Sequence, residues 1–147
     1  WIFPLIAAGL LGVGSPTLAD TVCECPAPPM PAAALGNADL VFFGQASFLG
    51  EAVTDQADSP IEEFTEFSVE GVWKGPAQKR LRIYTRTSEP HCAYAFEAGK
   101  RYLVYANRDR KRFSNRFRAS ACSRTKPADH SLPDLAILGD PEHRFDR

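Results

Sequence analysis

The stretch Asp39-Leu-Val-Phe-Phe-Gly-Gln-Ala-Ser-Phe-Leu49 carries the clearest structural signal in this chain. Apolar or small side chains recur at every second position, at Leu40, Phe42, Gly44, Ala46 and Phe48. This alternation predicts a strand with one face in the core, because successive side chains of a strand point to opposite faces. Glycine inside a strand often marks a bulge, and we expect one at Gly44.

Further segments fit short strands with turn residues between them. The predicted strands are Glu63–Trp73, Leu81–Arg86, Arg101–Asn107 and Phe113–Ala121. In the first of these, the expected core face holds Thr65, Phe67, Val69, Gly71 and Trp73. Short helices are expected at Ala32–Leu35 and Leu132–Leu138, each followed by a glycine. The pattern predicts a mainly β fold, a five-stranded OB-fold-like closed barrel with short flanking helices, and the alternative is a β-sandwich.

The 147 residues are 44% hydrophobic, which is enough for one core. Residues 20–139 are expected to form the domain, and the charged tail 140–147 is expected to be loose. The net charge is −1, which argues against a dedicated nucleic-acid binder. No apolar run long enough to span a membrane follows the first 19 residues.

Residues 1–19 are uncharged, and an apolar run from Trp1 to Val13 leads to small residues that end at Ala19. This order is typical of a secretory signal peptide, cleaved here after Ala19, and we expect the printed chain to begin inside that signal. The mature protein is therefore expected to be secreted, either to the extracellular space or to a periplasm.

Four cysteines at positions 23, 25, 92 and 122 fit two disulfides in an oxidising compartment. A bond from Cys23 to Cys25 is disfavoured because it would close a very small loop. Either remaining pairing closes loops of roughly 70–100 residues, each contributing on the order of 4 kcal/mol. The rival interpretation is a metal site built from the four cysteines with His91, but Cys-x-Cys fits zinc poorly. Two disulfides that start within three residues of each other suggest that the segment Cys23–Pro26 must be rigid.

Charge is segregated along the chain. Between Glu51 and Glu70 every charged residue is acidic, and between Lys100 and Lys126 every charged residue except Asp109 is basic. An anionic surface or glycan could bind the basic hairpin of this second segment. Single-stranded nucleic acid is a weaker candidate for an exported protein.

Catalytic motifs are missing from the sequence. The three histidines, His91, His130 and His143, are isolated, and neither HExxH nor GxSxG occurs. Glu62 and Glu63 would point to opposite faces of one strand, so they do not suggest an acid–base pair. We therefore expect neither enzymatic activity nor a cofactor.

Several motifs resemble netrin-like domains, most closely the N-terminal domain of tissue inhibitors of metalloproteinases. The matching motifs are Cys23-Glu24-Cys25-Pro26, Asn37-Ala38-Asp39-Leu40-Val41, Trp73-Lys74-Gly75-Pro76, Ile83-Tyr84-Thr85, Tyr102-Leu103-Val104-Tyr105-Ala106, and the half-cystines Cys92 and Cys122. They run in the family's order and cover roughly residues 23–139. The resemblance implies the disulfides Cys23–Cys92 and Cys25–Cys122.

The resemblance also implies a mechanism, inhibition of a zinc metalloendopeptidase. In that family the α-amine and carbonyl of the first cysteine bind the protease zinc and displace its water. The corresponding ridge here would consist of Cys23, Glu24, Cys25 and Pro26, with Ser88, Glu89, Pro90 and His91 alongside. The chain would hold no metal of its own. The alternative is a non-inhibitory netrin-like module that binds a protein or a glycan.

Overall fold

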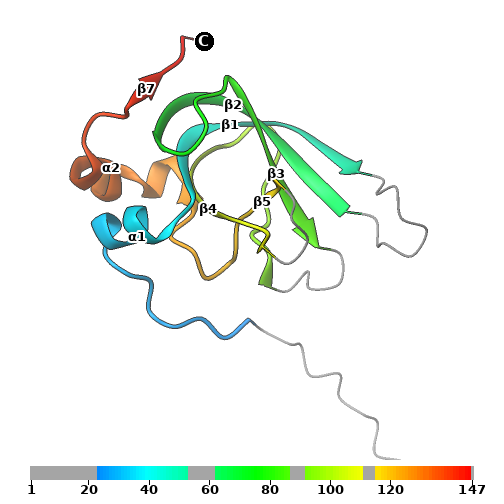
Figure 1. The fold of residues 1–147 in the computed structure, drawn as a ribbon, viewed down its shortest axis with the longest axis horizontal. Coiled ribbons are helices and arrows are strands. Elements are labelled where there is room, and N and C mark those ends of the chain that lie inside the picture. The colour runs from blue at the N-terminus through cyan, green and yellow to red at the C-terminus, as the bar shows by residue number, and fades with distance from the viewer. Residues whose placement is uncertain (1–22, 53–61, 87–91, 111–114, 147) are drawn as a thin grey trace, which may run out of the picture.

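The computed structural model describes residues 23–52, 62–86, 92–110 and 115–146. Within these residues the chain is mainly β, with one seven-stranded sheet and two short α-helices (Figure 1). The strands are β1 (Leu40–Ala52), β2 (Glu62–Lys74), β3 (Arg80–Arg86), β4 (Arg101–Arg108), β5 (Phe117–Arg118), β6 (Lys126–Pro127) and β7 (His143–Arg144). The helices are α1 (Pro31–Asn37), the 3-10 helix η3 (Ala128–His130) and α2 (Leu132–Leu138).

Five of the strands form a closed ring of hydrogen-bonded neighbours. β1 pairs with β2 and with β4, β2 pairs with β3, and β5 bridges β3 to β4. All of these pairs are antiparallel except β3 with β5. Because every described strand belongs to one sheet, the alternative of two stacked sheets is wrong.

The ring has a different apolar cluster on each of its two faces. The inner cluster includes Phe42, Phe67, Ile83, Val104 and Phe117, from all five strands of the ring. The outer cluster joins strand residues to the helices and consists of Ala34, Ala38, Val41, Trp73, Leu103 and Tyr105. Alternate residues of β1 and β4 therefore enter opposite clusters, which explains why long runs of both strands are buried.

The bulge expected at Gly44 is confirmed. The pairing of β1 with β2 shifts between Phe43, which pairs with Gly71, and Gly44, which pairs with Val69, so Glu70 is an extra residue in β2. A Cβ atom at Gly44 would lie 2.6 Å from the carbonyl oxygen of Ser68, so only glycine fits there without a shift. The extra residue reverses the alternation of β2, and Trp73 therefore enters the outer cluster. The prediction that Trp73 shares a face of the strand with Phe67 is therefore wrong.

A second register shift corrects the prediction for Phe48. Ala46 pairs with Phe67, but Phe48 pairs with Glu66, which leaves Ser47 as an extra residue. Beyond this point the side chains of β1 change faces. Phe48 is 56% exposed and packs against the ring of Phe64.

Two segments in the C-terminal third of the chain differ from expectation. Within the described part of the predicted Phe113–Ala121 strand, only Phe117–Arg118 is a strand, in β5. The tail 140–147 is not loose where it is described, because β7 pairs with β2. Phe145 donates its backbone N–H to the carbonyl of Glu70 and packs against the inner cluster. Four predicted strands and the helix Leu132–Leu138 are confirmed to within a few residues.

Candidate functional site

The segment Cys23–Met30, called here the N-terminal strip, runs across the surface before α1 begins. Cys23 is half-buried, and every residue from Glu24 to Met30 is exposed. Prolines at positions 26, 28 and 29 fix their own φ angles and keep the preceding residues extended. The strip is therefore a stiff, extended and accessible length of backbone.

Two disulfides fasten the strip to the segments that precede β4 and follow β5. Cys23 bonds to Cys92 and Cys25 bonds to Cys122, with Cα–Cα distances of 5.1 and 5.0 Å. This is the pairing that the resemblance implied, and it is confirmed. Both ends of the Cys23-Glu24-Cys25 tripeptide are thus covalently held, so Glu24 is fixed between two anchors.

Cys92 and Cys122, to which the strip is bonded, belong to one small patch. Ala93 and Ser120 form an antiparallel bridge. The N–H of Ala121 donates to the carbonyl of Cys92 over 2.9 Å, and the N–H of Cys122 donates to the hydroxyl of Ser120 over 3.0 Å. Both disulfides therefore rest on a single hydrogen-bonded support.

The rival interpretation of a metal site has a geometric basis but lacks its ligands. The sulfur atoms of Cys23, Cys25 and Cys122 all lie within 4.8 Å of one another. A cysteine binds zinc as a thiolate. All four cysteines are paired in disulfides, so the cluster offers no thiolate in this structure.

Half of the predicted ridge can be placed. Cys23, Glu24, Cys25 and Pro26 lie together on the strip, against Cys92 and Cys122. The carboxylate of Glu24 makes no hydrogen bond or ion pair with another described residue, and it is exposed. The other predicted ridge residues, Ser88, Glu89, Pro90 and His91, lie outside the described residues.

A groove of about 630 Å³ borders the patch that holds the disulfides. Cys92, Ala93 and Ser120 line one part of it, and Tyr84 and Arg118 line another. A partner seated on the N-terminal strip would therefore lie close to both the strip and this groove.

A buried ion cluster lies behind the other end of the strip, and sequence reasoning missed it. Asp134 of α2 is only 2% exposed. Its carboxylate accepts hydrogen bonds from Arg124 (2.6 and 2.8 Å), from Lys126 (2.9 Å) and from the hydroxyl of Tyr105 (3.2 Å). The remaining guanidinium nitrogen of Arg124, Nη1, donates to the carbonyl of Pro29 over 2.9 Å.

The contacts in this cluster shift the pKa values of Asp134, Arg124 and Tyr105. Burial alone would raise the pKa of Asp134, but hydrogen bonds and charges from Arg124 and Lys126 outweigh it and lower that pKa. The hydrogen bond to Asp134 raises the pKa of Arg124. Burial, and then the charge of Asp134, raise the pKa of the Tyr105 hydroxyl. At neutral pH the neutral phenol of Tyr105 therefore lies beside the ionised carboxylate of Asp134 and the charged guanidinium of Arg124.

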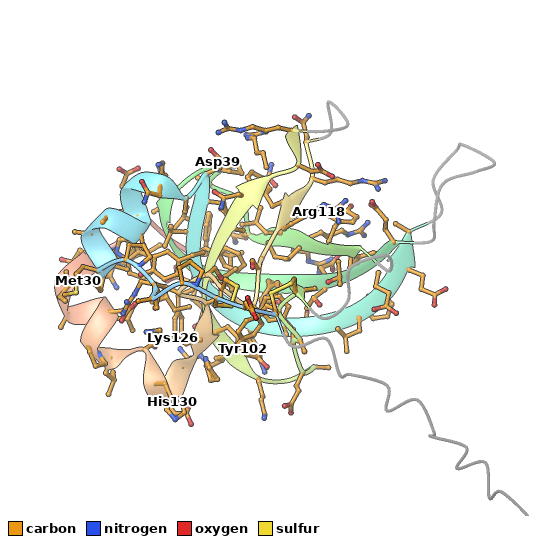
Figure 2. The ribbon with its side chains drawn as sticks, turned by 90° about the horizontal axis from the view of Figure 1, so that it is seen from below. Met30, Asp39, Tyr102, Arg118, Lys126 and His130 are labelled. Atoms are coloured by element: carbon orange, nitrogen blue, oxygen red, sulfur yellow. A yellow bond between two sulfur atoms is a disulfide. The ribbon has the colours of Figure 1, made fainter. Side chains whose placement is uncertain are left out.

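A second ion cluster takes up basic residues near the predicted hairpin. Glu62, which is 1% exposed, forms ion pairs with Arg116 and Arg118, and Arg118 also bonds to Asp109. The Arg118–Glu62 distance is 2.7 Å. Burial opposes ionisation of Glu62, yet the hydrogen bonds and charges of Arg118 and Arg116 lower its pKa. Figure 2 shows Arg118 on the side of the molecule away from the helices, and Lys126 beside them.

The segregation of charge in the sequence is thus largely cancelled in space. Arg101 pairs with Glu70, and Arg82 pairs with Glu66. Arg110 is 84% exposed, and its guanidinium lies 3.6 Å from the carboxylate of Asp39. Lys111 and Arg112, which the hairpin prediction included, lie outside the described residues. Where the chain is described, little unpaired positive charge gathers into a surface for an anion.

The two described histidines lie on different elements. His130 is on η3, 3.9 Å from Asp129, and His143 is on β7, with both side chains exposed. His91 lies outside the described residues. Glu62 is buried while Glu63 is exposed, which confirms that the two carboxylates face opposite sides of β2.

No helix in the described part of the chain is long and apolar enough to cross a membrane. The two disulfides fit an oxidising compartment. Among known proteins, no family model and no curated sequence matches this chain. The N-terminal strip and its supports are therefore the features of this chain that bear on its function.

Proposed function

We propose that this protein is a secreted inhibitor of zinc metalloendopeptidases, resembling tissue inhibitors of metalloproteinases. The α-amine and the carbonyl oxygen of Cys23 would bind the catalytic zinc of the protease. They would displace the water that attacks the peptide bond, since a catalytic zinc keeps one position open for that water. On this proposal the ring of strands is an OB-type barrel that serves as a rigid carrier.

One observation carries the proposal: two disulfides within three residues hold an exposed chain segment flat. The first residues of a domain normally fray. Stabilisation alone would need no pair of bonds so close together, whereas a backbone ligand for a metal must be held in position. Preorganisation of this kind reduces the entropy lost on binding and so increases affinity.

The chemistry makes a strict demand on the N-terminus. A peptide-bonded nitrogen has no free lone pair for zinc, so Cys23 must be the first residue of the active form. Asp20, Thr21 and Val22 precede it in the printed sequence and would have to be removed. Glu24 would then enter the first pocket of the protease. An ionised Glu24 favours a pocket that contains a cation, because burying an unpaired carboxylate is costly.

The test compares two forms of the oxidised protein, one that begins at Cys23 and one that begins at Asp20. Intact mass before and after reduction verifies that each form contains two disulfides. Both forms are then assayed against the same panel of zinc endopeptidases. We expect the form beginning at Cys23 to bind at least about 100-fold more tightly, equivalent to roughly 2.7 kcal/mol. Equal inhibition by the two forms, or none by either, would contradict the chelation mechanism.

The second candidate is a non-inhibitory netrin-like module that binds a protein partner without chelation. The exposed and unpartnered carboxylate of Glu24 favours this candidate, because it can be recognised whether or not residues precede Cys23. A glycan or anionic surface at the basic segment receives less support, since its described cations are mostly paired. Binding of the longer form to a partner, lost in Glu24→Gln, would favour the module over the inhibitor.

A further inference from the structure

We propose that Arg124 is a positioning residue for the N-terminal strip. It links the carbonyl of Pro29 to the buried carboxylate of Asp134 and thereby sets the direction in which the strip leaves α1. The link itself is independent of the function proposed above, but its effect on inhibition rests on that function.

The strip has few other ways to be held between Cys25 and α1. Pro26, Pro28 and Pro29 have no backbone N–H to donate. The carbonyl of Met30 already accepts the N–H of Ala34 in the first turn of α1. Within the described residues, the bond from Arg124 to Pro29 is the hydrogen bond that ties the α1 end of the strip to the body of the protein.

The geometry requires an arginine. Its Nε and Nη2 atoms donate to the two oxygens of Asp134, at 2.8 and 2.6 Å, while Nη1 points to Pro29 at 2.9 Å. A planar guanidinium presents these donors in a fixed fork, so holding one partner orients the donor toward the other. A lysine ammonium is a single point and would retain only part of this arrangement.

Burial makes the link stiff. The side chain of Arg124 is 15% exposed and that of Asp134 is 2% exposed. Lys126 and Tyr105 hold the same carboxylate from other directions, and both come from segments of the sheet. The Nη1 donor that reaches Pro29 is therefore held in place by both α2 and the sheet. Its hydrogen bond fixes the position of the Pro29 carbonyl, and with it the direction of the strip.

The experiment compares Arg124→Lys with Lys126→Gln in the oxidised protein. Both substitutions disturb Asp134, but only Arg124 contacts Pro29, so Lys126→Gln is the matched control. The methyl order parameter of Ala27, in the middle of the strip, reports the rigidity of its backbone. The methyl group of Ala34, buried in α1, reports whether the fold is intact.

We expect Arg124→Lys to lower the order parameter of Ala27 and to leave that of Ala34 unchanged, while Lys126→Gln changes neither. An equally ordered Ala27 in both variants would overturn the proposal. With a protease that the parent protein inhibits, Arg124→Lys should dissociate about 3- to 10-fold faster than Lys126→Gln. Equal dissociation rates would overturn the positioning role.

The two proposals can fail separately. If no protease is inhibited by the parent protein, the proposed function fails, whereas the result for Ala27 still decides whether Arg124 orders the strip. A rigid strip without inhibition would support the positioning role within a binding module.

Discussion

The Sγ atom of Cys23 lies 3.6 Å from the Sγ atom of Cys122, although the two residues belong to different disulfides. The two disulfides therefore lie side by side where they hold the N-terminal strip. This proximity brings a sulfur of each disulfide within reach of the other.

The proximity predicts disulfide exchange in Cys25→Ser. The substitution frees Cys122, whose thiolate lies beside Cys23 and can attack that sulfur, releasing Cys92 as a thiol. Peptide mapping after alkylation at pH 8 should find a Cys23–Cys122 bond and a modified Cys92. Retention of Cys23–Cys92 alone, with only Cys122 alkylated, would contradict this prediction.

Removing one whole disulfide should destabilise the protein without freeing a thiol. The double variant Cys25→Ser/Cys122→Ser is expected to lose about 2–5 kcal/mol of unfolding free energy, as small secreted domains do. Urea denaturation measures this loss. The double variant Cys23→Ser/Cys92→Ser is the matched comparison, because it opens a loop of 69 rather than 97 residues. An unchanged free energy of unfolding in either variant would show that the disulfide removed from it does not stabilise the folded state.

The Asp134 cluster should be far more sensitive than a surface ion pair. Asp134→Asn leaves the partly buried Arg124 and Lys126 without their buried counter-charge and is expected to cost about 3–5 kcal/mol of unfolding free energy. Glu66→Gln, which breaks the more exposed pair with Arg82, should cost at most about 1 kcal/mol. Comparable losses in the two variants would show that the Asp134 cluster is weaker than its burial indicates.

Acid should destabilise the fold through Glu62 and Asp134. The folded state holds both pKa values below their ordinary values of 4.5 and 3.8. The unfolded chain therefore takes up protons first as the pH falls, and stability is lost from about pH 5 downward. Urea unfolding at a series of pH values should show this slope. Glu62→Gln should make the slope shallower, and an unchanged slope would exclude Glu62 as a source.

Gly75, in the turn after β2, should be harder to replace than Gly99. Both have positive φ angles, of 98° and 86°. A Cβ atom at Gly75 would lie 3.0 Å from the carbonyl oxygen of Asp39, whereas one at Gly99 would meet nothing within 4 Å. We expect Gly99→Ala to cost about 1–2 kcal/mol for the backbone conformation alone. Gly75→Ala should cost more, measured by thermal or urea unfolding, and equal costs would rule out the close contact as a cause.

Local patterns in the sequence predicted the main strands well. The alternation around Leu40 and Phe42 gave the first strand, and Gly44 marked its bulge. Positions beyond a bulge were predicted on the wrong face, as Phe48 and Trp73 show. Gly44 signalled that a bulge was near, but nothing local identified Glu70 or Ser47 as the extra residue, because an insertion appears only where two strands are aligned.

The sequence likewise predicted one part of the candidate site and missed another. Cysteine positions and prolines marked the N-terminal strip, since covalent and backbone restraints are properties of the residues themselves. Arg124, Lys126 and Asp134 gave no comparable signal, because charged residues in a chain usually lie on the surface.

The amino-acid sequence by itself determined where the four long strands and the helices form, where the chain must be extended, and which residues could be cross-linked. These follow from side-chain periodicity, proline geometry and the number of cysteines. Only the tertiary structure decided which charges meet. The acidic and basic segments lie far apart in the sequence, yet strand pairing places Glu62 beside Arg116 and Arg118. Coulomb energy and desolvation depend on separation and burial in space, and both exist only once the chain has folded.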